Sequence, residues 1–303
     1  MRIGQACEEF LRHCENVRKL SEHTIRAYRL DLARFARFTG ANIDVATFDR
    51  STLQSYVEHL FIEHHLKETS AKRHVASLRS LFHWLEEENR ILEDPFRGAR
   101  VRIRLPRRLP RVLSRAELAT ILQHPPAGDY SSLTARIAAE LLFATGIRVA
   151  ELAGLRDDDI DLTAGVITIL GKGSRQRRVY IPDSDIRELV VAYRHARTEK
   201  GHVSESFLTN SRGGPVSPQL IRRLIRTLAE RAALTRRVTP HMFRHSVATY
   251  LLEEGVDIRY VQRLLGHRSI VTTEIYTHVA DAVLKFDGPP DFGPVITCVR
   301  PGY

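Results

Sequence analysis

An arginine-rich stretch broken by prolines divides this chain of 303 residues. The window from Arg97 to Arg115, RGARVRIRLPRRLPRVLSR, holds eight arginines and no acidic residue in 19 positions. Pro106 and Pro110 lack the backbone N–H that a helix needs, and each restricts the residue before it, so an extended path is predicted. An ordinary flexible linker is the alternative. The window and the chain length together predict two folded domains joined by a basic connector.

The predicted domain limits follow from this break. We expect a helical domain over residues 1–94, a connector over 95–113, a second domain over 114–287 and a C-terminal tail over 288–303. The tail begins GPPDFGP, which excludes a helix there.

The composition limits the kinds of molecule that the protein is expected to bind. The formal charge of +10 and a pI near 9.8 point to a polyanion. Nucleic acid fits better than a membrane, because no apolar run approaches the roughly 18 residues that span a bilayer. The N-terminus carries no leader, so we expect a cytoplasmic protein. Cys7, Cys14 and Cys298 have no metal-ligand spacing, and a disulfide is not expected; Cys7 and Cys14 are spaced as two buried positions on one helix face.

The first domain is predicted to be helical throughout. Ser21 is placed to cap a helix from Glu22 to Phe38 that ends at Gly40 and carries one apolar stripe. Residues 70–88 repeat the pattern, with Lys72, Arg73, His74 and Arg79 on the predicted outer face. A basic outer face is either solvated or contacts phosphates. The candidate phosphate contacts of this domain and the connector are Arg26, Arg29, Lys72, Arg73, Arg79, Arg100, Arg102, Arg104, Arg107 and Arg108.

The second domain is predicted to combine helices with a small sheet. Ser114 can cap a helix, and a long apolar helix over residues 133–144 stops at Gly146. Arg148 then opens a helix with Glu151 one turn later on the same face. The β-branched runs 166–170 and 178–181 flank Gly171-Lys172-Gly173-Ser174 and predict a hairpin. A phosphate-binding P-loop is excluded, because the residues around this Gly-Lys pair do not have the spacing of that motif.

The sequence signals for the remaining elements of the second domain are weaker. Residues 206–208 predict a short strand, and a helix near Ser217 presents Arg222 and Arg223 for groove or backbone contact. The acidic run from Asp157 to Asp161 is predicted to be a solvated turn, with a metal site as the alternative. The fold class expected for the whole chain is mainly α with a small β-sheet (α+β).

The richest chemistry lies between His241 and Tyr276. Two histidines, an arginine and a tyrosine fall within 36 residues: His241 and Arg244 three apart on a predicted helix, His267 after the helix stop Gly266, and Tyr276. A tyrosine hydroxyl with a pKa near 10 attacks a phosphodiester only if a neighbour takes its proton or stabilises the anion. Arginine binds phosphate as a fork, and histidine donates or exchanges a proton. Each alone would be an ordinary surface or core residue; together they suit phosphoryl transfer to tyrosine.

The same residues resemble a known family. The segments His241-Met242-Phe243-Arg244-His245, Leu265-Gly266-His267 and Tyr276-Thr277-His278-Val279 resemble the C-terminal signature of tyrosine recombinases of the phage integrase type, Xer-like members included. Residues 144–152 resemble the first-arginine motif of that family, and Lys172 its hairpin lysine.

The resemblance implies a function and an architecture. It implies an N-terminal SAM-like core-binding domain and a C-terminal catalytic domain that clamp DNA, and a tetramer on two recombination sites, with a second recombinase as a further option. The implied reaction is site-specific cutting and rejoining through a 3′-phosphotyrosyl intermediate, without metal, ATP or other cofactor. The implied roles are nucleophile for Tyr276, charge stabilisation for Arg148, Arg244 and His267, proton transfer for His241, leaving-group protonation for Lys172 with Arg175 and Arg177 as backup donors, and orientation of Arg148 for Glu151.

Several functions stay open at this point. The non-helical tail favours a recombinase of a mobile element or plasmid, acting in integration, excision or resolution, over a Xer-type chromosome-dimer resolvase. A type IB topoisomerase would use similar chemistry on one duplex. A non-catalytic DNA-binding regulator could keep the fold, but it has no chemical use for the full set of catalytic side chains.

Overall fold

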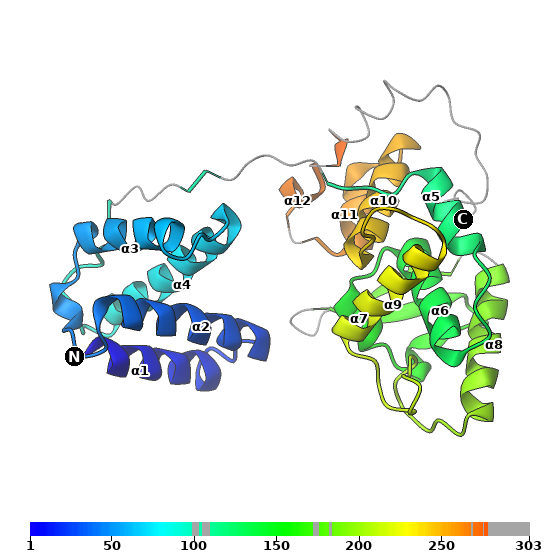
Figure 1. The fold of residues 1–303 in the computed structure, drawn as a ribbon, viewed down its shortest axis with the longest axis horizontal. Coiled ribbons are helices and arrows are strands. Elements are labelled where there is room, and N and C mark those ends of the chain that lie inside the picture. Colours follow the sequence, from blue (N-terminus) through cyan, green and yellow to red (C-terminus); the bar gives the residue numbers. More distant parts are fainter. Residues whose placement is uncertain are drawn as a thin grey trace. The chain divides into compact units, whose positions relative to one another are not determined.

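The computed structural model describes residues 1–98, 103–104, 110–171, 176–181, 184–267, 269–274 and 276–277 (Figure 1). The chain divides into two compact units, Met1–Arg107 and Arg108–Tyr303, and each is described by itself. The predicted domain limits stay predictions, and the expected tail lies outside the described residues.

The first unit is a bundle of helices (Figure 1). The Ser21 hydroxyl accepts the N–H of Thr24 at the start of the second helix, and the left-handed Gly40, with φ of 88°, ends it, as predicted. The apolar stripes meet in one core that includes Phe10, Leu32 and Phe35, and the free Cys7 and Cys14 are buried with it. Its elements are α1 (Ile3–Asn16), α2 (Glu22–Thr39), the 3-10 turn η1 (Val45–Thr47), α3 (Arg50–Ile62) and α4 (Glu68–Glu87).

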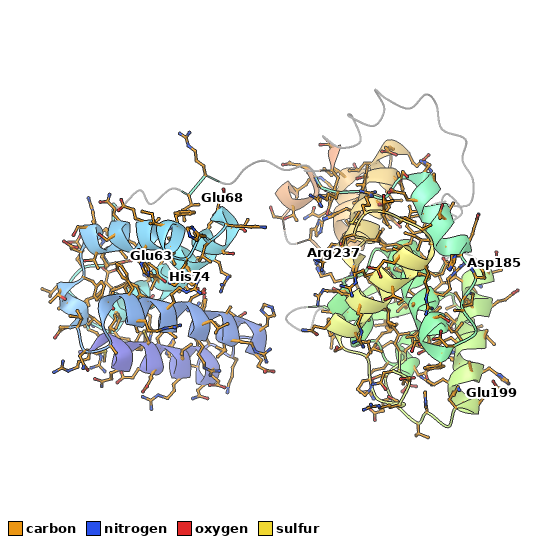
Figure 2. All side chains as sticks on the ribbon, viewed as in Figure 1. Glu63, Glu68, His74, Asp185, Glu199 and Arg237 are labelled. Carbon is orange, nitrogen blue, oxygen red and sulfur yellow. The ribbon has the colours of Figure 1, made fainter. Side chains whose placement is uncertain are left out.

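One prediction about this bundle is wrong. His74 lies inside it and not on the outer face of α4 (Figure 2), with 3% of its surface exposed. The reason is Asp31, a buried carboxylate on α2 that accepts hydrogen bonds from Arg73 and Ser77 and lies 3.2 Å from the His74 ring. Burial lowers the pKa of His74 to about 4, so the ring is neutral at physiological pH and offers no charge to a phosphate.

The second unit packs its helices around α6 and a small sheet. Almost all positions of α6 that face inward are small or apolar, which lets it pack directly against α8, α9 and α10. A capping box at Ser114 and Glu117 starts the first helix, as predicted for the serine. Its helices are α5 (Arg115–Gln123), α6 (Tyr130–Thr145), α7 (Val149–Ala153), α8 (Ser184–Glu199), α9 (Pro218–Arg231), α10 (Pro240–Glu253), α11 (Ile258–Leu265) and α12 (Val271–Glu274).

The sheet is an antiparallel meander of three strands, β1 (Ile160–Asp161), β2 (Val166–Leu170) and β3 (Gln176–Tyr180), which follows the 3-10 turn η2 (Asp157–Asp159). The predicted hairpin is confirmed, with Ile167 opposite Val179 and both buried. Lys172 and Arg175 at its tip lie outside the described residues.

Two local predictions need correction. Residues 206–208 do not form a strand; Ser206 makes an isolated bridge to Arg156, and the hydrogen bonds of Phe207 to Leu155 and of Val216 to Leu208 do not extend into a ladder. The acidic turn is not simply solvated, since Asp157 pairs with Arg194 at 2.9 Å and also with Arg197. Among the described residues, every helix is too short or too polar to cross a membrane.

Candidate active site

Helix α10 places the first two residues of the site. Pro240 occupies the first turn, where its missing N–H costs nothing, and His241 follows it with an exposed ring. Arg244 comes one turn later and is 4% exposed. Its Nη1 and Nη2 donate to the carbonyl oxygens of Gly146 and Leu265, each at 2.6 Å. Burial lowers the pKa of Arg244 to about 10, so the guanidinium still carries its charge at neutral pH.

Arg148 lies between two elements that hold it from opposite sides. It caps α7, and its Nη1 donates to Glu151 Oε1 at 2.9 Å, while the other carboxylate oxygen accepts the Arg148 backbone N–H. Nη2 donates to the carbonyl of Gly266 at 2.9 Å. The side chain is 38% exposed, so the oriented arginine remains partly accessible to a ligand. This is the geometry that the spacing of Arg148 and Glu151 predicted.

Arg177 on β3 completes the arrangement, and sequence reasoning gave it only a backup role. Its Nη1 and Nη2 donate to the two oxygens of Glu151 at 2.9 and 2.7 Å, and its Nε donates to the carbonyl of Leu264 at 3.0 Å. Burial alone would raise the pKa of Glu151, but the hydrogen bonds from Arg177 and Arg148 lower it to about 2. A signal was present: Arg177 shares a strand face with the buried Val179, and a buried arginine needs an acid.

The last turn of α11 therefore collects three arginines. The consecutive carbonyls of Leu264, Leu265 and Gly266 accept from Arg177, Arg244 and Arg148 respectively. These carbonyls are free because a helix leaves its last four unpaired, and the negative end of the helix dipole favours cations there. Gly266, with φ of 64°, ends the helix as predicted.

Tyr276 lies buried beside these cations, with 2% of its surface exposed. Burial raises the pKa of its hydroxyl, and the charges of Arg244 and Arg148 act in the opposite direction. Its hydroxyl is 2.8 Å from Nδ1 of His245, and the ring stacks at 6.3 Å on that of His267. His245 lies in the recognised motif, but no role was predicted for it.

The histidines are neutral in this site. Burial, followed by the charges of Arg244 and Arg148, lowers the pKa of His267 to about 4. Its Nδ1 lies 2.9 Å from the hydroxyl of the buried Thr273. Desolvation also lowers the pKa of His241, and the positive charge of Arg222 on α9 is the next cause.

The structure thus brings together five of the six predicted catalytic residues, Arg148, His241, Arg244, His267 and Tyr276, around one cluster of positive charge. The sixth, Lys172, lies outside the described residues. Arg222 and Arg223 are both exposed on α9, and the charge of Arg222 reaches His241.

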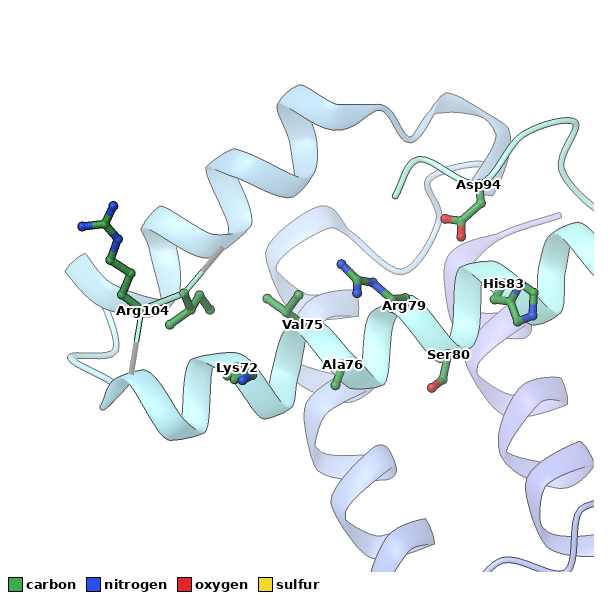
Figure 3. A pocket seen from close by; sticks show the side chains of 9 residues that line it. Lys72, Val75, Ala76, Arg79, Ser80, His83, Asp94 and Arg104 are labelled. Atoms are coloured by element: carbon green, nitrogen blue, oxygen red, sulfur yellow. The ribbon is translucent and has the colours of Figure 1, made fainter. Parts of the chain in front are cut away.

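The first unit carries a separate basic groove (Figure 3). Its volume is about 810 Å³, and one face of α4 and residues 94, 103 and 104 line it. Arg79 also lies over the ring of Phe96, with 5.4 Å from its guanidinium carbon to the ring centroid. Three cations against one acid give the groove a net positive charge; these charged residues are Lys72, Arg79, Arg104 and Asp94.

The remaining predicted DNA contacts divide into three groups. Arg26 and Arg29 are exposed on α2, and Arg26 pairs with Glu22 at 2.8 Å. Arg73 is half-exposed but its guanidinium is engaged by the buried Asp31 at 2.6 Å, which leaves it less free than predicted. Arg100, Arg102, Arg107 and Arg108 lie outside the described residues.

Within the described ranges, one group of side chains could hold a metal ion. His83, Glu86 and Asp94 have ligand atoms within 4.8 Å of one another. All three belong to the first unit, and Glu86 already pairs with Arg97 at 2.7 Å. The group and the cluster around Tyr276 therefore belong to different units.

Comparison with known proteins identifies the family of the chain. The family model described as "Phage integrase family" matches residues 111–282, and that described as "Phage integrase, N-terminal SAM-like domain" matches residues 7–89. A tyrosine recombinase of Agathobacter rectalis is 38% identical over 282 residues, which cover 89% of this chain and 90% of the relative. The tyrosine recombinase XerC of Xylella fastidiosa is 36% identical, with 91% and 93% covered.

Solved structures share the fold. XerH bound to its palindromic difH substrate after cleavage matches with a TM-score of 0.74 at 23% identity, covering 92% of this chain and 83% of that one. A lambda integrase tetramer bound to a Holliday junction matches with a TM-score of 0.70 at 18% identity, covering 91% and 77%.

Proposed function

Because the chain belongs to the phage integrase family of tyrosine recombinases, enzymes that break and rejoin DNA at specific sites, we propose that Tyr276 is its nucleophile. The observation that carries this proposal is the buried hydroxyl of Tyr276 beside two oriented guanidinium groups, those of Arg148 and Arg244. Family membership also argues against a regulator that only binds DNA.

In the proposed reaction, Tyr276 Oη attacks the scissile phosphate and the bond to the 5′ oxygen breaks. The products are a 3′-phosphotyrosyl link and a free 5′-hydroxyl. Arg148 and Arg244 bind the non-bridging oxygens, on which negative charge grows in the transition state, and Glu151 keeps Arg148 aimed before DNA arrives. Because the phosphotyrosyl ester retains the energy of the broken phosphodiester bond, attack by a 5′-hydroxyl rejoins the strand without ATP.

The proposed roles of His267, His241 and Lys172 are to donate or transfer protons. We assign Nδ1 of His267 as the acceptor of the Thr273 hydroxyl 2.9 Å away, which leaves the ring proton on Nε2 to donate to a phosphate oxygen. His241, exposed at the start of α10, assists proton transfer near the same phosphate. Lys172 at the hairpin tip protonates the leaving 5′ oxygen. Cationic side chains occupy the role that metal ions play in other phosphoryl transfers, so the proposal requires no metal or other cofactor.

The test is covalent capture. The protein is incubated without metal or ATP with a library of nicked duplexes carrying a randomised core, and protein–DNA adducts are isolated on a denaturing gel. The expected result is an adduct that Tyr276→Phe abolishes and whose DNA end maps the cleavage site. Binding without any adduct would contradict the proposal. An adduct that persists in Tyr276→Phe would move the nucleophile elsewhere.

We further propose that the protein binds double-stranded DNA as a homotetramer on two recombination sites, with or without a second recombinase. Structures of relatives show dimers and tetramers on recombination sites and a Holliday junction. The basic groove on α4, the exposed arginines of α2 and those of α9 support phosphate contacts by both units. With DNA as substrate, the expected compartment is the cytoplasm of a bacterial cell.

Two biological roles remain candidates. The tail that follows the matched region favoured a mobile-element or plasmid recombinase, whereas similarity to several XerC proteins over about nine-tenths of the chain favours a chromosome-dimer resolvase. A plasmid with two copies of one captured site separates resolution from integration. Recombination between identical sites supports a resolvase, of a chromosome or of a plasmid; a requirement for two different sites supports an integrase.

A further inference from the structure

The hydrogen bond of the Tyr276 hydroxyl leads to a histidine with no predicted role. Among the described residues, its partner is Nδ1 of His245 at 2.8 Å, and the two rings lie 5.4 Å apart. His245 directly follows Arg244 on α10. One turn of helix therefore holds a phosphate-binding guanidinium and presents an imidazole to the reacting oxygen.

The other two histidines are less well placed to take the hydroxyl proton. Nδ1 of His267 is occupied by the Thr273 hydroxyl, and its ring lies alongside the Tyr276 ring at 6.3 Å. His241 lies one turn earlier on α10, with its ring 6.3 Å from that of His245. A general base must be within about 3.2 Å of the atom it deprotonates, or one water away. His245 meets this requirement directly.

We propose that His245 is the general base that deprotonates Tyr276 during strand cleavage. As the bond from Oη to phosphorus forms, the proton moves from Oη to Nδ1 of His245. The bond from phosphorus to the 5′ oxygen breaks, and that oxygen leaves with a proton from the general acid. In rejoining, the 5′-hydroxyl attacks, the phosphotyrosyl bond breaks, and His245 returns the proton to Oη.

The surroundings keep both partners in the required state. Burial, then the neighbouring His241 and Arg244, lowers the pKa of His245 to about 4, so Nδ1 is free to accept a proton at neutral pH. Burial raises the pKa of Tyr276, so the phenol keeps its proton until attack. A phosphodiester bound by Arg148 and Arg244 partly neutralises their charges, which raises the basicity of His245 when substrate is present.

This inference rests on the proposed function, since it requires Tyr276 to be the nucleophile. The test uses full-length protein and one nicked duplex taken from the covalent capture. His245→Asn puts an amide oxygen near the position of Nδ1, which preserves hydrogen bonding without basicity. Single-turnover adduct formation should fall about 100-fold in this variant, the scale of general-base catalysis, while DNA affinity stays at the wild-type value.

Two further measurements separate basicity from structure. Added imidazole should raise adduct formation by His245→Ala at least about tenfold but leave His245→Phe unchanged, because phenylalanine fills the space. A duplex with a 5′-bridging sulfur needs no leaving-group proton. It should restore cleavage by Lys172→Ala and leave the defect of His245→Asn in place.

The opposite results would overturn the inference. Wild-type cleavage by His245→Asn would show that hydrogen bonding alone matters. If the asparagine variant did not fold, failure of imidazole to rescue His245→Ala would overturn the inference instead. Relief of His245→Asn by the bridging sulfur would assign His245 to the leaving group. Persistence of the adduct in Tyr276→Phe would instead refute the proposed nucleophile, so the two failures are distinguishable.

Discussion

Arg177 shows how one side chain can control a site that it does not enter. Its guanidinium donates hydrogen bonds to both carboxylate oxygens of Glu151, and Glu151 in turn orients Arg148. A lysine at this position would keep the charge but lose the planar fork that binds two oxygens at once. The position therefore demands arginine geometry as well as positive charge.

We predict that Arg177→Lys lowers the single-turnover cleavage rate by about 10- to 100-fold, because misplacement of a catalytic group by about 1 Å costs that much. DNA affinity should change little. The matched control is Arg178→Lys, since Arg178 is the next residue on β3 and is exposed on the opposite face. Equal cleavage by the two variants would show that the Arg177 fork has no role in orienting the site.

Glu151 gives the second prediction at this scale. Its pKa is about 2 in the folded protein against an ordinary value of 4.5. A depressed carboxyl pKa stabilises the fold above pH 4.5, and this contribution disappears as the pH falls towards 2. Its size is on the order of 3 kcal/mol from the shift in pKa.

Urea unfolding of wild type and Glu151→Gln at several pH values checks this sign. The wild type should be the more stable protein near neutral pH, and its advantage should shrink steadily as the solution becomes more acidic than pH 4.5. An advantage that is constant across the acidic range would mean that ionisation of Glu151 does not contribute to stability.

At the scale of elements, the site depends on where two helices stop. Gly146 ends α6 in the left-handed region, with φ of 61°, and turns its carbonyl to Arg244. A Cβ at Gly146 would lie 2.8 Å from a methyl carbon of Leu265 and 3.4 Å from one of Val247. The end of α6 is thus packed directly on α10 and α11.

We predict that Gly146→Ala costs more stability than left-handed backbone strain alone. Gly201→Ala is the control, because Gly201 has a φ of 68° and no neighbour within 4 Å of a Cβ. The control should lose about 1–2 kcal/mol, and Gly146→Ala a further 1–3 kcal/mol from overpacking. Urea denaturation measures both, and equal losses would refute the packing argument.

The elements themselves were largely predictable from the sequence. Caps at Ser21 and Ser114, stops at Gly40, Gly146 and Gly266, and the apolar periodicities correctly predicted the helices, because these signals act within a few residues. The i, i+3 pairs of α7 and α10 also predicted which side chains share a face.

Pairings between distant elements were not predictable in the same way. Arg177 meets Glu151 only after the sheet packs against α7 and α11, and His74 is buried only because Asp31 on another helix supplies a polar partner. A helical pattern shows which face is apolar but not which polar group lies across from it. The contact of His245 with Tyr276 was missed for the same reason, since it spans 31 residues.

On the scale of the whole molecule, charge is distributed over both units. The basic groove of the first unit and the arginine cluster of the second each carry excess positive charge without a full set of acids. Phosphate contacts release counterions, so each contact steepens the salt dependence of DNA binding by about 0.9 in a log–log plot. Both units should therefore contribute to DNA affinity, while the proposed chemistry lies in the second unit.

We predict that Lys72→Ala combined with Arg79→Ala lowers this salt slope by about 1.8 and weakens binding to all sequences alike, since the two groove residues would lose two phosphate contacts. Fluorescence anisotropy at several salt concentrations measures the slope. Lys200→Ala, at an exposed position with no proposed contact, should leave the slope unchanged. A sequence-dependent loss in the double variant would indicate base recognition by the groove.

The three arginines gathered at the end of α11 also bear on how such a protein can evolve. Arg148, Arg177 and Arg244 all bind main-chain oxygens there, and every amino acid supplies the same oxygen. Substitutions at position 264 are therefore constrained mainly by packing, whereas inserting or deleting one residue in this turn would shift all three anchors together. Lineages and engineered libraries should tolerate new apolar side chains at position 264, but Gly266 should stay glycine because its φ of 64° strains any other residue, and the length of the turn should stay fixed.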